Sequence, residues 1–99
     1  LGNAYDRALA DVDVLLLPTA PSLPHELSDD LAPAARLRRG WSVFANTSQF
    51  NMTGHPALTV PAAAIGGLPV GAMLVGRRSD DARLLAIARV YERELGWRP

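Results

Sequence analysis

The 99-residue sequence contains no cysteine and no lysine, and its ten basic residues are all arginines. Without cysteine, the chain forms no disulfide and offers no thiolate to a metal ion. Without lysine, it has no amine that serves as a base, because an arginine guanidinium stays protonated in proteins. An arginine-rich chain without lysine is typical of GC-rich bacterial coding, so we expect a bacterial protein.

An excess of charge of either sign is also absent, since ten acidic residues balance the ten arginines. No basic stripe stands out, so we expect no nucleic-acid partner and no binding to an anionic membrane. Apolar residues make up 48% of the chain and charged residues 20%, which is the composition of a soluble globular protein. A chain of this length buries one modest core.

Residues 56–76 carry no charge, and this run is nearly long enough for a transmembrane helix. However, Pro61 and Pro69 lie inside it, and each proline costs a helix interior about 3 kcal/mol. Two strands, 57–64 and 70–75, joined by a turn at Gly66-Gly67, avoid this cost. The run therefore predicts a β-hairpin and no membrane span.

A second apolar run, 12–17, is short, contains β-branched residues and is closed by Pro18. This pattern predicts a strand that is buried on both faces. Asn46 or Thr47 is predicted to cap a helix of one or two turns, which Gly54 ends in a left-handed conformation. The chain thus alternates strand, loop and helix, and the fold class is α/β.

Three further helices are predicted. Residues 4–10 have the pattern of the end of a helix that begins before the sequence given, and 31–39 form a short helix ended by Gly40. An amphipathic helix begins at residue 79 or 80 and ends at Gly96. Its apolar stripe, which we expect to pack on the sheet, consists of Leu84, Ile87, Ala88, Tyr91 and Leu95.

No catalytic motif is complete within the chain. Ser48 and His55 are seven residues apart and no Gly-x-Ser-x-Gly sequence is present, so both are interpreted as structural residues. His25 and His55 lack the spacing of metal ligands, and no metal site is expected. The aspartate pairs at 29–30 and 80–81 precede predicted helices, where capping accounts for them.

Three segments, in this order and spacing, resemble the carboxy-terminal region of the amidase-signature family. They are Asp13–Thr19 (DVLLLPT), Phe50–Pro61 (FNMTGHPALTVP) and Gly67–Arg77 (GLPVGAMLVGR). The resemblance implies a mixed-sheet α/β fold, to which this segment contributes strands and a C-terminal amphipathic helix. Residues 1–99 are thus expected to be the C-terminal segment of an amidase domain, truncated at its N-terminus.

The resemblance also implies hydrolysis of carboxylic amides to acid and ammonia through an acyl-enzyme, by a Ser-Ser-Lys triad. Those residues belong to an earlier region of the family, so the chain alone is expected to be inactive and to need the remainder of the amidase. The expected substrate is a small-molecule amide, with no cofactor, in a cytoplasmic enzyme whose parent forms a homodimer. Two alternatives stay open: a free-standing binding module without catalysis, and a fragment of an amidotransferase A-type subunit.

The residues in the matching motifs that are expected to form a wall of the substrate pocket are Phe50, Asn51, Thr53, His55 and Met73. Ordinary core packing is an equally good interpretation for Phe50 and Met73. Met73 stands where many family members carry glutamine. Its apolar thioether suggests a branch acting on simple aliphatic or aryl amides rather than the glutamyl-tRNA amidotransferase A-type subunits.

Overall fold

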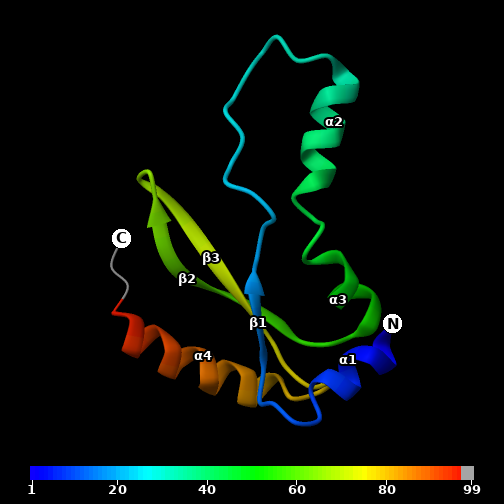
Figure 1. Cartoon of the computed structure of the whole chain (residues 1–99), viewed down its shortest axis with the longest axis vertical. Helices are drawn as coiled ribbons and strands as arrows, with labels where there is room; N and C mark the ends of the chain where they lie inside the picture. The colour runs from blue at the N-terminus through cyan, green and yellow to red at the C-terminus, as the bar shows by residue number, and fades with distance from the viewer. Residues whose placement is uncertain (97–99) are drawn as a thin grey trace.

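A three-stranded antiparallel sheet with helices on both of its faces forms the body of the computed structural model, which describes residues 1–96 (Figure 1). The elements in chain order are α1 (Gly2–Ala8), β1 (Leu15–Pro18), α2 (Pro33–Ser42), α3 (Ser48–Thr53), β2 (Ala57–Ile65), β3 (Leu68–Val75) and α4 (Asp81–Leu95). The predicted α/β class is confirmed.

The predicted hairpin forms two of the three strands, with β3 in the centre of the sheet. Strands β2 and β3 pair antiparallel, and β1 adds to the other side of β3, which gives the strand order β1-β3-β2. Gly66 and Gly67 make the turn with φ angles of 57° and 79°, a region that residues without a Cβ adopt freely. A register shift between Pro61 and Ala63 bends β2, as a β-bulge does.

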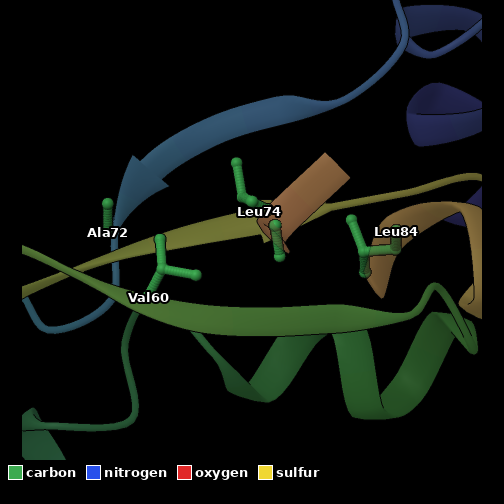
Figure 2. Packing of buried hydrophobic residues seen from close by; sticks show 5 residues of the cluster. Val60, Ala72, Leu74 and Leu84 are labelled. Carbon is green, nitrogen blue, oxygen red and sulfur yellow. The ribbon is translucent and has the colours of Figure 1, made fainter. Parts of the chain in front are cut away.

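One face of the sheet packs against α4. Alternate residues of a strand point to opposite faces, and Ala72 and Leu74 of β3 join Val60 of β2 against the helix (Figure 2). Leu84 and Ala88 of α4 complete this cluster, with Ile87 and Tyr91 partly buried beside it. The predicted stripe is confirmed for these four residues, whereas Leu95 is 41% exposed.

The opposite face carries a second cluster, formed by Phe50 of α3 with Met73 and Val75 of β3. Tyr5 of α1 packs against it, and its ring lies 4.9 Å from that of Phe50. Helix α3 reaches this face because Gly54 turns the chain in a left-handed conformation, with a φ of 76°. That helix end was predicted, although no side-chain hydrogen bond caps its start at Thr47.

Strand β1 differs from its prediction. It begins at Leu15 rather than at residue 12, and it is buried on one face only: Leu15 and Leu17 pack against the Phe50 cluster, while Leu16 is 62% exposed. The segment before it bends because the Arg77 guanidinium binds the carbonyl oxygens of Leu9 and Val12. Within the described residues β1 pairs with β3 alone, so Pro18 fits the strand without a missing ladder bond.

Helix α2 also departs from the prediction, because it passes through Gly40 and ends at Ser42. Gly40 does not adopt a positive φ, and the hydroxyl of Ser42 donates to the Arg39 carbonyl at 2.7 Å. With the segment before it, α2 projects from the body of the molecule (Figure 1). The radius of gyration is accordingly 15.6 Å, compared with about 13 Å for a compact 100-residue domain.

The first and last helices form where they were predicted, but the predicted aspartate caps do not, because no side-chain hydrogen bond caps α4 at Asp80 or α2 at Ala32. Helix α1 ends at Ala8, two residues before its predicted end, and α4 ends at Gly96, whose φ is 63°. Among residues 1–96, no helix combines the length and apolar character needed to cross a membrane.

A close approach at Gly71 leads to a testable prediction. A Cβ at this position would lie 2.7 Å from Cγ2 of Thr59 and 3.2 Å from Oγ1 of Thr19. We expect Gly71→Ala to lower the free energy of unfolding by about 1–3 kcal/mol, because overpacking forces neighbouring groups apart. Urea unfolding provides the measurement.

The control for this variant is Gly40→Ala, at a helical position where an added Cβ meets nothing within 4 Å. Alanine is favoured over glycine inside a helix by about 0.5–1 kcal/mol, so this variant is expected to stabilise the protein. Equal effects of the two substitutions would contradict the close approach at Gly71.

Candidate functional site

A groove of about 540 Å³ lies on the same face of the sheet as the Phe50 cluster. Residues 19–24, which follow β1, form one wall, and the end of the β2–β3 hairpin with Ile65 and Val70 forms the other. Val43, just after α2, closes one side. The volume falls in the range of small-molecule sites, roughly 300–1,000 Å³.

The groove has an apolar and uncharged lining with few polar groups. None of the residues that line it is acidic, basic or histidine. Its hydroxyls belong to Thr19, Ser22 and Thr59, and the Thr19 hydroxyl donates a hydrogen bond to Oγ1 of Thr59 at 3.1 Å. The position of Thr19 is fixed by its backbone N–H, which donates to the Gly71 carbonyl at 3.1 Å.

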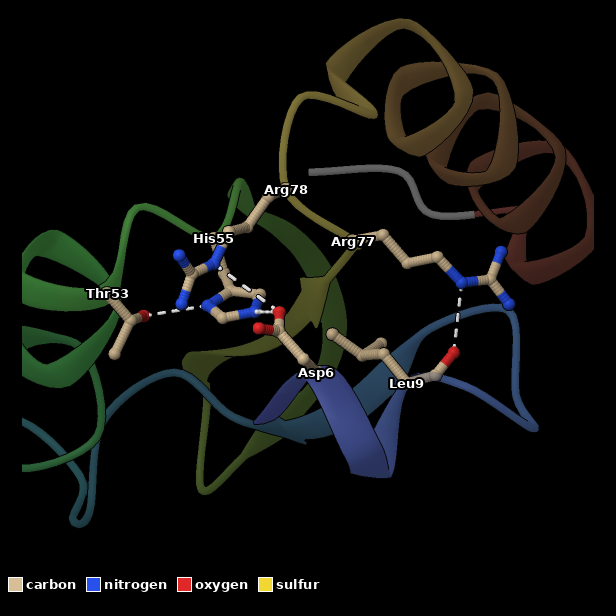
Figure 3. A network of polar contacts seen from close by, with 6 residues as sticks. All are labelled: Asp6, Leu9, Thr53, His55, Arg77 and Arg78. Carbon is tan, nitrogen blue, oxygen red and sulfur yellow. Dashed lines mark hydrogen bonds and ion pairs between the residues drawn. The ribbon is translucent and has the colours of Figure 1, made fainter. Parts of the chain in front are cut away.

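A second cluster of polar groups surrounds His55, whose side chain is fully buried (Figure 3). Its Nε2 lies 2.9 Å from Oδ1 of Asp6 in α1, and its Nδ1 lies 2.8 Å from the Thr53 hydroxyl. Asp6 also pairs with Arg78, at 3.4 Å between Nε and Oδ1. These contacts tie α1 to the end of α3 and to the segment that follows β3.

The partners of His55 fix the positions of its protons. A carboxylate only accepts hydrogen bonds, so Nε2 carries the proton that it donates to Asp6, and in the neutral ring Nδ1 accepts from the Thr53 hydroxyl. An acid, a histidine and a hydroxyl also make up hydrolytic triads. Here, however, the His55 side chain is fully buried in the described structure, and the cluster joins α1 to the end of α3.

The five residues predicted for a pocket wall fall into three groups. Phe50 and Met73 are buried together in the core cluster, Thr53 and His55 are joined in the polar cluster, and Asn51 is exposed. None of the five lines the groove. Their role in a substrate pocket therefore remains a proposal, and in the described structure they shape the face of the sheet beside the groove.

The residues that do line the groove, above all Thr19, Thr59 and Val43, were not predicted from the sequence. The strand register indicates on which face Thr59 lies, because Thr59 is opposite Met73 and therefore shares its face of the sheet. Within residues 1–96, no three histidine, aspartate or glutamate side chains gather in a group suited to a metal ion.

Comparison with known proteins identifies the family. The family model described as Amidase matches residues 1–85. This chain belongs to the amidase-signature family. It is 44% identical over 94 residues to a Rhodococcus erythropolis protein described as an uncharacterized protein in the nthA 5′ region, covering 94% of this chain and 47% of that protein.

The other relatives of this amidase-family chain include two kinds of enzyme. An enantioselective amidase of Rhodococcus rhodochrous is 43% identical over 95 residues, which are 94% of this chain and 18% of the enzyme. The A-type subunit of the Cenarchaeum symbiosum glutamyl-tRNA(Gln) amidotransferase is 42% identical over 88 residues, 89% of this chain and 18% of that protein. The chain thus spans about half the length of the first relative and about a fifth of these two.

Solved structures of the family share the fold. A bacterial aryl acylamidase superposes with a TM-score of 0.78 at 28% identity, over 97% of this chain and 21% of that enzyme. The A-type subunit of the Thermotoga maritima glutamyl-tRNA(Gln) amidotransferase gives a TM-score of 0.75 at 26% identity, over 99% of this chain and 21% of that protein. The arrangement of strands and helices is therefore that of amidase-signature enzymes.

Proposed function

We propose that this chain is the carboxy-terminal part of an amidase that hydrolyses the C–N bond of carboxylic amides to an acid and ammonia. The observation that carries this proposal is the match of the Amidase family model to residues 1–85. The chemistry is supplied by a Ser-Ser-Lys triad in an upstream region, since these 99 residues contain no lysine. The partner of the chain is then the remainder of its own polypeptide, in a cytoplasmic homodimer.

The shape of the molecule supports a place within a larger protein. In the described residues, the outer edges of β1 and β2 pair with no strand, and unpaired edges that carry apolar side chains favour association. On α2 and just after it, Leu37, Trp41 and Phe44 are each more than half exposed. Such groups are stabilised when another part of a protein covers them.

A related function is favoured by some of the same relatives. Several are A-type subunits of amidotransferases, at 33–42% identity, so an A-type subunit of a transamidation complex is the second candidate. A non-catalytic binding module is the third, and it draws support from the Rhodococcus erythropolis relative, because this chain covers 47% of that protein but 18% of the Rhodococcus rhodochrous amidase and of the Cenarchaeum symbiosum subunit.

The test combines the intact mass of the native gene product with an ammonia-release assay on acetamide, benzamide and glutamine. A product several times heavier than 10.6 kDa that releases ammonia from acetamide or benzamide is the expected result. Release from glutamine alone favours the amidotransferase reading. A native product of 10.6 kDa without activity on any amide would exclude the amidase and leave the binding module.

A further inference from the structure

The groove described above combines three features of a ligand site that the Phe50 and His55 clusters lack. It is open to solvent, it is large enough for a small molecule, and it presents a pair of hydrogen-bonded hydroxyls on an apolar wall. The Phe50 cluster is filled by its own side chains and the His55 cluster is sealed. The groove therefore offers a ligand the room that these two clusters lack.

The two threonine hydroxyls define one hydrogen-bond direction. The hydrogen bond between them uses one of their two protons; with Thr19 donating to Oγ1 of Thr59, no acceptor among the described residues takes the Thr59 proton. A hydroxyl is a donor as well as an acceptor, so the Thr59 proton is available to a group in the groove. The natural partner is a carbonyl oxygen.

The lining also selects the charge of the ligand. Ile65, Val70 and Val43 supply apolar surface, and no lining residue carries a charge. An ammonium or carboxylate placed there would lose hydration without gaining a counter-ion, which is costly. A neutral carbonyl compound with an aliphatic or aryl substituent fits both the walls and the hydroxyl pair.

We propose that this groove binds the apolar acyl or aryl group of a neutral carboxamide, with Thr59 donating to the carbonyl oxygen. The inference rests on the proposed function for the identity of the ligand as an amide, and it names the substrate class. The groove sets specificity by size at Val43 and by hydrogen bonding at Thr59. Gly71 has no Cβ, which leaves space beside it for the side chains of Thr19 and Thr59 to contact each other.

The test uses the full-length gene product and a probe that contains no scissile C–N bond. Acetophenone offers the aryl group and the neutral carbonyl, and benzoate offers the same ring with a negative charge. Titration by ligand-observed NMR is expected to show acetophenone binding at least tenfold tighter than benzoate. Equal binding of the two probes, or no binding of acetophenone, would overturn the proposal.

Two variants assign the binding to the groove. Val43→Trp fills it and is expected to weaken acetophenone binding at least tenfold, while Val90→Trp, the same change at an exposed position of α4, leaves it unchanged. Thr59→Val removes the hydroxyl and retains the branched shape, and a three- to tenfold loss is expected. Unchanged binding in both groove variants would place the probe elsewhere and refute the assignment.

The same variants separate this proposal from the proposed function. If acetophenone binds as expected but no amide is hydrolysed, the groove stands and the amidase proposal fails. If amides are hydrolysed while Val43→Trp leaves the KM ratio of benzamide to acetamide unchanged, the amidase stands and the groove is not its specificity site.

Discussion

Replacing Phe50 with alanine is expected to lower the free energy of unfolding by about 3–5 kcal/mol, the range for deleting a buried aromatic ring. The ring is 4% exposed and packs against Met73 and Val75 of β3. It also contacts Tyr5 of α1 with ring centroids 4.9 Å apart. The substitution therefore opens a cavity in the apolar cluster that packs α1 and α3 against the sheet.

Leu85→Ala is the control, because it also truncates a large apolar side chain, at a position of α4 that is 60% exposed. Its effect in the same urea-unfolding experiment is expected to stay below about 1 kcal/mol, as for most surface substitutions. Similar losses from the two variants would show that Phe50 is not a core residue in the native protein, and would return it to the pocket wall predicted from its motif.

The elements predicted best are those whose signals are local. The hairpin follows from two apolar runs around Gly66-Gly67, and α4 follows from its apolar stripe and from Gly96 at its end. The end of α3 follows from Gly54 in the same way. In each case the residues that determine the element lie within the element or next to it in the sequence.

The misassigned elements depend on partners that the sequence does not reveal. Leu16 lies in an apolar run, but only one face of β1 is covered in the described residues, so it is exposed there. Gly40 suits a helix end, yet it does not adopt a positive φ, and the helix runs through it to Ser42. Propensity is a weak guide where neighbouring contacts decide the outcome.

The candidate site depends even more on contacts between residues that are far apart in the sequence. The motif containing Phe50 and His55 was recognised, but the partner of His55 is Asp6, which lies 49 residues away in the sequence. The groove is formed by residues 19–24, Val43 and the hairpin end, which come together only when β1 joins β3. Contacts between such distant residues leave no periodic pattern in the sequence from which the groove could be predicted.

The second large effect is expected at Asp6. Asp6→Ala removes the acceptor of the buried His55 Nε2–H, and an unsatisfied buried donor costs about 1–3 kcal/mol. The ion pair with Arg78 adds little, since both side chains are 47% exposed. We expect a loss of about 1–3 kcal/mol in the free energy of unfolding, with faster amide hydrogen exchange in α1, which Asp6 ties to His55.

Two comparisons show whether hydrogen bonding to His55 is the cause. Asp6→Asn keeps a carbonyl oxygen that accepts from Nε2, so it is expected to retain most of the stability that Asp6→Ala loses. Asp11→Ala removes a carboxylate from an exposed residue that has no ion-pair partner in residues 1–96, and it is expected to have little effect. If Asp6→Ala proved as stable as the unsubstituted protein, the prediction would be wrong. Water would then replace the carboxylate beside His55, because Asp6 is half-exposed. Tyr5 and Leu9 alone would hold α1.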